Sequence, residues 1–378
     1  MSVFDDLVGQ EAVVEQLSAA VHGQGMTHGW LFTGPPGSGR SIAARAFAAA
    51  LQCASNGCGT CEACHQARSG NHPDVAVIVP EGLSLGVNEA REIILRSSRA
   101  PTRGRWQVTL IEDADRMTEQ AANALLKTIE EPPPHSVLLL SAPSADDLLP
   151  TIRSRCRLAA LRTPSPEAVA SVLVRDGVDP SMAAFAARAA QGHIGRARRL
   201  ATDEVARTER RDVLSLPRSL GSVGSALAAA KDLVDAAKEE ADKLAAGRDD
   251  AEKDALATAL GAGATGKGMT AGTPRGGAGA LKELEKRQKS RGTRTQRDAL
   301  DRALIDLAAF YRDVLSLQLG TGSVPVHGDL VEQALHIAQA TTPEDTLHRI
   351  DAVLACRTAI DTNVAPQLAV EAMALALR

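Results

Sequence analysis

Short apolar runs alternate with amphipathic stretches over the N-terminal part of the chain. Three of the runs lack the every-second-residue alternation of a half-exposed strand, which is typical of buried strands in a parallel sheet. They occupy residues 30–33, 107–111 and 136–141. Helical spacing follows at 42–51 and at 118–130, where a run of prolines from Pro132 ends the helix. Strands that alternate with helices predict an α/β fold.

Beyond Pro164 the strand-like runs disappear and only helical spacing remains. Three amphipathic helices are predicted close together, at 166–176, 180–191 and 193–203. Four more are predicted nearer the C-terminus, at 298–319, 329–340, 343–362 and 366–377. Between the two groups, residues 225–260 are rich in Ala and charged residues, and 261–279 are rich in Gly and Ala. The composition of 261–279 predicts a flexible linker or a disordered insert, and the whole of 225–290 is expected to be an Ala/Gly-rich, charged linker or insert.

Composition and charge narrow the class of protein further. Hydrophobic residues make up 44% of the 378 positions but aromatic residues only 2%, which favours a core of packed Ala-rich helices. The 42 basic and 46 acidic residues give a net charge of −4, so any contact with nucleic acid must be local. The sequence has no apolar run of membrane-spanning length and no signal-peptide pattern at its N-terminus. We therefore expect a soluble, cytoplasmic protein with no membrane partner.

The segment 34–41 matches the phosphate-binding pattern G-x-x-x-x-G-K-[ST] at all but one position. It consists of Gly34, Pro35, Pro36, Gly37, Ser38, Gly39, Arg40 and Ser41. Glycines let backbone amides face a phosphate, the following helix adds its positive end, and Ser41 would contact Mg²⁺. Arg40 replaces the usual Lys, and a planar guanidinium does not substitute for a compact ammonium group. The segment is either a degenerate ATP and Mg²⁺ site or a Gly-rich turn without a ligand.

Carboxylates follow the predicted strand 107–111, as they do in phosphate-loop ATPases. An active site needs an Asp that holds Mg²⁺ and then a Glu that polarises water, whereas this chain has Glu112 and then Asp113. The reversed order displaces each carboxylate by about one bond length, and a misplacement of about 1 Å can cost roughly 10²-fold in rate. Alternatively, the two acids cap the helix that begins near Thr118.

Four of the six cysteines fall within twelve residues, at Cys53, Cys58, Cys61 and Cys64. Four thiolates at this spacing on a Gly-containing loop are typical of a closed structural Zn²⁺ site. An iron–sulfur cluster and a redox C-x-x-C pair are the alternatives. His65 adjoins the fourth cysteine and is interpreted as a bystander rather than a ligand.

Three further motifs accompany these features. They are Asp6–Gln10, which reads DLVGQ, Asn123–Pro133, which reads NALLKTIEEPP, and Thr151–Cys156, which reads TIRSRC. With the phosphate loop and the cysteine cluster, they give residues 4–200 a sequence that resembles the bacterial clamp-loader branch of the AAA+ superfamily. The resemblance implies an α/β P-loop AAA+ domain with a zinc module, a small helical lid and an all-α collar domain. The implied boundaries are 1–162 for the AAA+ domain with its cysteine loop 53–64, 163–215 for the lid, 225–290 for the linker or insert, and 291–378 for the oligomerisation collar.

Departures from the family pattern indicate the type of subunit. Four positions differ from the ATPase subunits of the family. They are Arg40, the Glu112–Asp113 order, the stretch 141–144, which has no sensor Thr, and Gly195, which stands in place of a sensor Arg. The resemblance therefore implies a delta-prime type of subunit, a largely non-catalytic stator that itself hydrolyses no ATP. Such a subunit assembles with delta and gamma/tau in the DNA polymerase III holoenzyme, a DNA-directed nucleotidyltransferase. The complex loads the sliding clamp on primed DNA during replication.

The alternative readings are a catalytically active gamma/tau-type ATPase, a DNA-remodelling ATPase and a P-loop phosphotransferase. The phosphotransferase reading has the least support, because it gives the motifs 123–133 and 151–156 no role.

Arginines carry the remaining functional expectations. The resemblance implies that Arg155, flanked by Ser154 and Cys156, acts as an arginine finger on a neighbouring subunit's ATP, although a local salt bridge beside Arg153 and Arg157 is the alternative. A second set, between the cysteine loop and strand 107–111, is expected to contact DNA phosphates or to form a solvated helix face. Its members are Arg91, Arg96, Arg99, Arg103 and Arg105.

Overall fold

The computed structural model describes residues 2–260 and 277–378, which form two compact units. The N-terminal unit comprises Met1–Pro80 and Ser84–Glu204, and the C-terminal unit comprises Glu81–Leu83 and Val205–Arg378. Each unit has its own hydrophobic core and is described here by itself. Within the described ranges, no helix combines the length and the apolar character that a membrane crossing requires.

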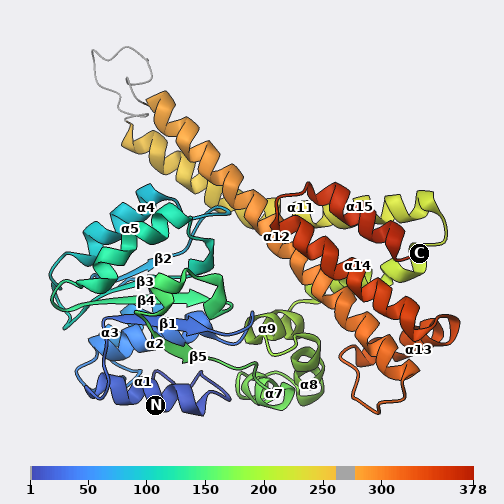
Figure 1. Cartoon of the computed structure of the whole chain (residues 1–378), viewed down its shortest axis with the longest axis horizontal. Coiled ribbons are helices and arrows are strands. Elements are labelled where there is room, and N and C mark those ends of the chain that lie inside the picture. Colours follow the sequence, from blue (N-terminus) through green and yellow to red (C-terminus); the bar gives the residue numbers. More distant parts are fainter. Residues whose placement is uncertain (1, 261–276) are drawn as a thin grey trace. The chain divides into compact units, whose positions relative to one another are not determined.

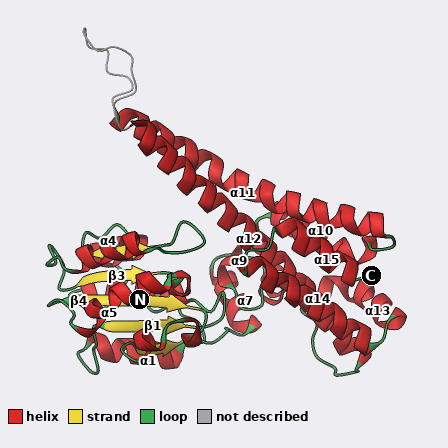
Figure 2. Ribbon diagram, turned by 45° about the horizontal axis from the view of Figure 1, so that its top comes forward, coloured by secondary structure: helices red, strands yellow, loops and turns green. Residues whose placement is uncertain are grey.

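A five-stranded parallel sheet organises the N-terminal unit, which confirms the predicted α/β fold (Figure 2). The strands are β1 (Gly29–Thr33), β2 (Val75–Ile78), β3 (Gln107–Ile111), β4 (Ser136–Ala142) and β5 (Arg157–Ala160). Their order across the sheet is β2-β3-β4-β1-β5, and every neighbouring pair is parallel. Every residue of β1, β3 and β4 is buried, in agreement with their continuous apolar runs.

Helices cover both faces of this sheet (Figure 1). They are α1 (Glu11–Val21), α2 (Arg40–Gln52), α3 (Glu62–Ser69), α4 (Val87–Ser97), α5 (Glu119–Glu130) and α6 (Pro150–Arg153), with short 3₁₀ turns at Ala114–Arg116 and Ala145–Asp147. Trp30 and Phe32 of β1 point to one face, where they pack against Phe47 of α2. Leu31 points to the other face and joins the core formed with α4 and α5. Alternate side chains of one buried strand thus supply two cores.

Three helices complete the N-terminal unit, at the positions that their spacing predicts. They are α7 (Pro166–Arg175), α8 (Pro180–Ala189) and α9 (Ile194–Thr202). Ser165 and Asp179 cap the first two with side-chain oxygens, and in both a proline follows at the first helical position. His193 caps the third, since its Nδ1 accepts a hydrogen bond from the Arg196 amide.

The C-terminal unit is all helical. Its helices are α10 (Glu204–Ser215), α11 (Val223–Ala259), α12 (Gly277–Gln318), α13 (Val331–Ala340), α14 (Pro343–Asp361) and α15 (Pro366–Ala376), with 3₁₀ turns at Leu216–Ser219 and Gly328–Leu330. Leu300, Leu304 and Phe310 of α12 are fully buried in its core, together with Val353 of α14 and Val370 of α15. The long helices α11 and α12 lie side by side in both views (Figures 1 and 2).

Most of the segment 225–290, which is expected to be a linker or an insert, is helical. Helix α11 continues to Ala259 and α12 begins at Gly277, while residues 261–276 lie outside the described residues. Ala has the highest helix propensity, and oppositely charged pairs one turn apart, such as Lys231–Asp235, support an exposed helix. The collar boundary predicted at 291 therefore falls inside one continuous helix, and α10 groups with the C-terminal unit rather than with the lid.

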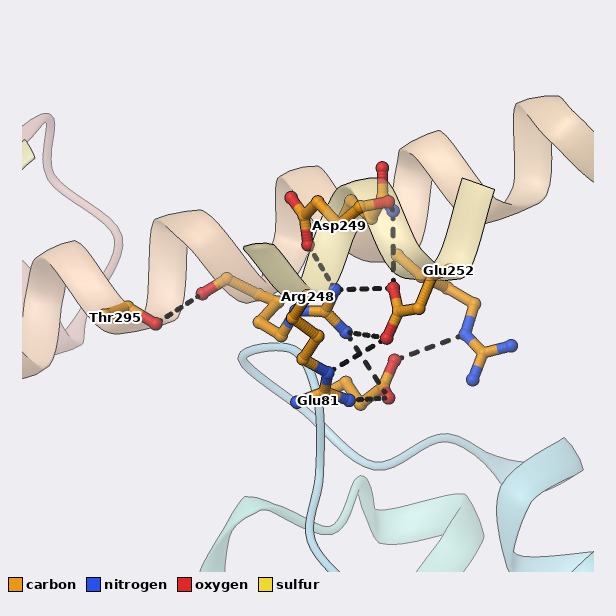
Figure 3. Close-up of polar contacts among 8 residues, drawn as sticks. Glu81, Arg248, Asp249, Glu252 and Thr295 are labelled. Atoms are coloured by element: carbon orange, nitrogen blue, oxygen red, sulfur yellow. Dashed lines mark hydrogen bonds and ion pairs between the residues drawn. The ribbon is translucent and has the colours of Figure 1, made fainter. Parts of the chain in front are cut away.

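Charged residues join α11 to α12 where few apolar side chains are available (Figure 3). The Arg291 guanidinium, with its side chain 12% exposed, donates to Glu252 Oε2 at 2.6 Å and also binds Asp249. Hydrogen bonds to Glu252, of which the one from Arg291 has the largest effect, lower the pKa of its carboxyl group to about 2, although partial burial acts to raise it. Glu81, which belongs to this unit, accepts from Arg248 at 3.1 Å. The cluster fixes the register of the two helices at this level.

Candidate functional site

The phosphate-loop segment leaves the carboxyl end of β1 and leads into α2, as its pattern predicts. Pro35 and Pro36 are exposed at its tip, and Ser41 is half-buried in the first turn of α2. At Gly37 the backbone has a φ of 85°, and an added Cβ would lie 2.4 Å from His193 Cβ. Only Gly fits this close approach, so the loop geometry depends on the sequence pattern.

Arg40 turns back onto the loop that it follows. Its Nη1 donates a hydrogen bond to the Gly34 carbonyl oxygen at 2.6 Å. Burial lowers the pKa of Arg40, while the charges of Asp113 and Asp115 oppose that shift. The guanidinium is therefore engaged with the chain's own backbone, whereas the usual Lys of this pattern reaches toward phosphates.

Gln10, from the DLVGQ motif, braces the loop against the end of the sheet. Its Nε2 donates to the Arg162 carbonyl oxygen at 2.6 Å and to the Ser38 carbonyl oxygen at 3.3 Å, and its Oε1 accepts from the Arg162 amide at 3.0 Å. The Gly34 amide donates to the Pro143 carbonyl oxygen, just beyond β4. Three separate segments thus hold the loop in one shape. The hydroxyl of Ser38 is buried there and makes no hydrogen bond in the part of the chain that the structure describes.

Both carboxylates predicted after β3 lie beside the loop, but Glu112 is neutralised. Arg45 of α2 approaches Glu112 Oε1 with Nε at 3.0 Å and Nη2 at 2.9 Å. Asp113 adopts a left-handed backbone with a φ of 49°. The alternative that these acids cap the next helix is wrong, because Thr118 caps α5 by accepting from the Ala121 amide.

Two residues of this site went unrecognised in the sequence. Asp115 has a buried Oδ1 without a hydrogen bond in the described structure, and burial together with Asp113 raises its pKa. Arg45 is the ion partner of Glu112. Its signal in the sequence is weak, since an Arg in an amphipathic helix is ordinarily solvent-exposed.

Arg155 forms a local ion pair in this chain. Its Nε lies 2.8 Å from Glu130 Oε1, and its Nη1 donates to the Thr151 carbonyl oxygen at 3.0 Å and to Ser154 Oγ at 3.1 Å. The side chain remains 40% exposed. Cys156 is half-buried, and burial raises the pKa of its thiol to about 12, so it is protonated at neutral pH.

The neighbouring arginines have separate partners. Arg153 pairs with Asp146, and Arg157 donates to the Gly25 carbonyl oxygen and stacks 5.2 Å from the centre of the Trp30 ring. The pair of Arg155 with the half-exposed Glu130 is open to exchange, as is the still more exposed pair of Arg153 with Asp146.

The four clustered cysteines converge on one point. Their sulfur atoms all lie within 4.8 Å of one another, with Cys53 Sγ 3.6 Å from Cys58 Sγ and 3.7 Å from Cys61 Sγ. A tetrahedral Zn²⁺ with Zn–S bonds of about 2.3 Å separates its sulfur ligands by about 3.8 Å. The donor set and its spacing therefore fit a closed four-thiolate metal site. His65 is exposed and does not belong to the group.

Local structure prepares these thiols to bind a cation. Cys53 ends α2 and Cys61 precedes α3, so two helix termini position half of the ligands. Hydrogen bonds from Thr60 lower the pKa of Cys58 to about 6, while burial raises the pKa of Cys64. A structural metal needs deprotonated ligands, and its binding free energy becomes folding free energy of the loop.

The predicted DNA-contact arginines lie on one stretch. Arg91 and Arg96 are on α4, and Arg99, Arg103 and Arg105 follow it before β3. All five side chains are exposed, and none of them has an ion-pair partner within residues 2–260 and 277–378. Unpaired guanidinium groups are available to phosphate oxygens.

Comparisons with known proteins concern mainly the N-terminal unit. The family described as "DNA polymerase III, delta subunit" matches residues 9–165. A delta' subunit of Pseudomonas aeruginosa is 39% identical over 170 residues, covering 43% of this chain and 50% of that protein. A delta' subunit of Bacillus subtilis is 32% identical over 177 residues, covering 46% and 54%. A gamma/tau subunit of Mycobacterium tuberculosis is 35% identical over 177 residues, covering 46% and 31%.

The chain spans about half or less of the length of these curated relatives. Relatives of the delta' and of the gamma/tau type match it about equally well. The predicted resemblance is confirmed: over residues 9–165, this chain is similar to delta' and gamma/tau subunits of DNA polymerase III.

Proposed function

We propose that this protein is a delta-prime-type clamp-loader subunit, a stator whose own nucleotide site is inactive. The observation that carries the proposal is the hydrogen bond from Arg40 to the Gly34 carbonyl oxygen. The one side chain that should meet the β and γ phosphates is turned onto the loop instead. Phosphoryl transfer depends on positioned positive charge at those phosphates, so this arrangement opposes catalysis.

The acidic side of the site supports the same conclusion. Catalysis requires one carboxylate on Mg²⁺ and another on the attacking water. Here Glu112 is neutralised by Arg45, and Asp113 lies on a tight left-handed turn. Restoring a single residue would leave the other defects in place.

The proposed role of the chain is to assist ATP hydrolysis in the nucleotide site of a neighbouring subunit. Arg155 acts in trans on the ATP of a neighbouring gamma/tau subunit, after exchanging Glu130 for the γ-phosphate. An arginine supplied in trans is worth roughly 10³–10⁵ in rate in other phosphoryl-transfer systems. The pair with Glu130 is exposed, and exposed pairs contribute only about 0–1 kcal/mol, so breaking it costs little.

The remaining parts have supporting roles in the proposed complex. Four cysteines hold one structural Zn²⁺, and the C-terminal helices join this chain to delta and gamma/tau. The unpaired arginines 91–105 contact the phosphates of primed DNA without reading its sequence. Contact with the sliding clamp is indirect, through the partner subunits.

The second candidate is a catalytic gamma/tau-type subunit or another DNA-dependent ATPase. It is favoured by the similarity to gamma/tau relatives and by the preserved glycines of the loop.

Measuring the phosphate released by ATP hydrolysis distinguishes the two candidate functions. The full chain is assayed alone and then in a complex reconstituted with delta and gamma/tau, with primed DNA and clamp present. The proposal requires a negligible rate for the chain alone and DNA-dependent hydrolysis by the complex. Turnover of the chain alone at about 1 s⁻¹ or more would establish the second candidate.

A further inference from the structure

A cavity lies at the edge of the sheet opposite the phosphate loop. It has a volume of about 480 Å³ and is lined by residues that precede β1 and β3, by the ends of α1 and α2, and by the cysteine loop. Because all five strands are parallel, their amino ends meet on this side and the phosphate loop lies at the other. The cavity is therefore separate from the nucleotide site.

The lining residues favour an aromatic, anionic ligand. Trp106 is partly buried and lines the cavity, and Arg105 beside it is exposed and free of any ion pair in the described ranges. His28, His22 and Asn56 add polar groups, and no carboxylate lines the cavity. The His28 Nδ1 donates to the Ser136 carbonyl oxygen at 2.6 Å, which leaves its Nε2 as an acceptor in the neutral ring.

The segment that carries Arg105 and Trp106 is held rigidly. The buried carboxylate of Asp74 accepts hydrogen bonds from the amides of Thr102, Arg103 and Gly104 and from the Thr102 hydroxyl, at 2.6–2.8 Å. Gln52 Nε2 donates to the Trp106 carbonyl oxygen at 2.5 Å. Gly104 lies so close to Gln52 that a Cβ there would approach Gln52 Oε1 to 1.9 Å. A loop fixed by this many contacts presents its side chains with little loss of entropy on binding.

We propose that this cavity is a subsite for one nucleotide of single-stranded DNA. The base stacks on Trp106, and the phosphate is bound by Arg105. The neighbouring unpaired arginines, Arg103 and Arg99, continue the positive path along the strand. Stacking on an aromatic ring combined with a basic path is how sequence-independent binding to single strands is built.

An acidic peptide is the competing occupant, and the observations favour nucleic acid. A carboxylate-rich peptide needs only the arginines and gains nothing from a partly buried indole flanked by the imidazoles of His28 and His135. A base has a π face that matches this surface, and the cavity exceeds the volume that a single carboxylate fills.

Intrinsic fluorescence gives a direct test, because the chain has two tryptophans and Trp30 is fully buried. Titration of the full chain with a dT₁₀ oligonucleotide is expected to quench Trp106. Arg105→Ala should weaken binding by about tenfold, whereas Arg188→Ala, which removes an exposed arginine from α8, should leave it unchanged. Polyglutamate of the same charge should neither quench nor compete at equal concentration.

Labelled oligonucleotide anisotropy provides the second readout. Trp106→Phe keeps a stacking ring and should retain most of the affinity, while Trp106→Leu should lose about five-fold to a hundred-fold. Circular dichroism and metal content confirm that each variant is folded. The proposal is overturned if Trp106→Leu binds like the parent chain, if Arg105→Ala has no effect, or if polyglutamate competes as well as the oligonucleotide. The binding test involves no ATP hydrolysis, so a negative result would leave the proposed stator function standing. In the same way, ATP hydrolysis by the isolated chain would contradict the stator function but not the nucleotide subsite.

Discussion

At the scale of single residues, the proposal of an inactive nucleotide site rests on the direction of a few charged side chains, Arg40 and Arg45 above all. The sequence predicted the phosphate loop, and it also predicted that Arg40 is a poor substitute for Lys. It could not predict the Arg40 contact with the Gly34 carbonyl oxygen or the Arg45–Glu112 pair, because both depend on side-chain directions set by tertiary structure.

Replacement of Arg40 by Lys tests whether this residue alone silences the site. The shorter, compact ammonium should release the Gly34 carbonyl oxygen and permit weak binding of a fluorescent ATP analogue. Hydrolysis by the isolated chain should stay negligible, since Glu112 remains paired with Arg45. Phosphate release and analogue titration measure the two effects separately, with Arg188→Lys as the matched control. Full turnover by Arg40→Lys would show that the other defects are harmless.

Asp74 links stability to pH through the loop 102–104. Burial acts to raise its pKa, but hydrogen bonds from Thr102, Gly104 and Arg103 prevail and lower it to about 2, below the ordinary value of 3.8. A depressed pKa means that the ionised form stabilises the fold above about pH 4, and that this contribution is lost as pH falls toward 2. Asp74→Asn should therefore lower the free energy of unfolding at pH 7 by about 2 kcal/mol.

The two proteins should converge in thermal stability between about pH 4 and pH 2. The control is Glu92→Gln, which alters an exposed acid on α4. A difference between Asp74→Asn and the parent chain that is constant over this range would rule out the linkage.

At the scale of elements, the sequence predicted long buried strands well and short ones poorly. Strands β2 and β5 have four residues each, which is too short for a periodic signal. The helices within 225–290 were not predicted, because the Ala and charge content of this segment describes an exposed helix as well as an unstructured segment. Contacts from α12, such as Arg291 with Glu252, decide between the two, and these are distant in sequence.

The ion cluster between α11 and α12 should control local opening of that helix pair. Arg291→Ala removes the cation that ties Glu252 and Asp249 of α11 to α12. Glu252 then keeps only one cation, Arg248 of its own helix, so both helices should open more readily there. Hydrogen exchange in 245–256 and 284–295 is expected to accelerate about tenfold. Lys253→Ala removes an exposed cation from α11 and should leave exchange unchanged. Equal exchange in the two variants would mean that the cluster contributes no stability.

The cysteine loop should contain one Zn²⁺ per chain. Cys58→Ser is expected to abolish stoichiometric zinc and to make residues 53–64 sensitive to protease, because metal binding supplies folding free energy to this loop. Cys356→Ser changes a buried thiol in the other unit and should retain the metal. Elemental analysis of reduced protein decides the identity of the ion. Zinc retained at full stoichiometry in Cys58→Ser, or iron found in place of zinc, would refute this assignment.

At the scale of the whole molecule, the proposed function is that of a stator, which hydrolyses no ATP itself and acts on a neighbouring subunit. The α/β fold and the family were predictable from motifs, since each motif is local in sequence. The division at residues 204 and 205 was not predictable, because it depends on the packing of α10 with the C-terminal helices. The proposed contribution of the chain to a complex rests on Arg155, whose pair with Glu130 is exposed.

The most direct test of the central claim is DNA-dependent ATP hydrolysis by a complex reconstituted with delta and gamma/tau around Arg155→Ala. The variant should fold and assemble like the parent chain. Hydrolysis at the site next to it should fall by about 10³-fold, and Arg155→Lys should restore little, since a point charge lacks the guanidinium geometry. Glu130→Gln, which removes only the local partner, should keep the parent rate. A complex with Arg155→Ala that hydrolyses ATP and loads clamps at the parent rate would contradict the account.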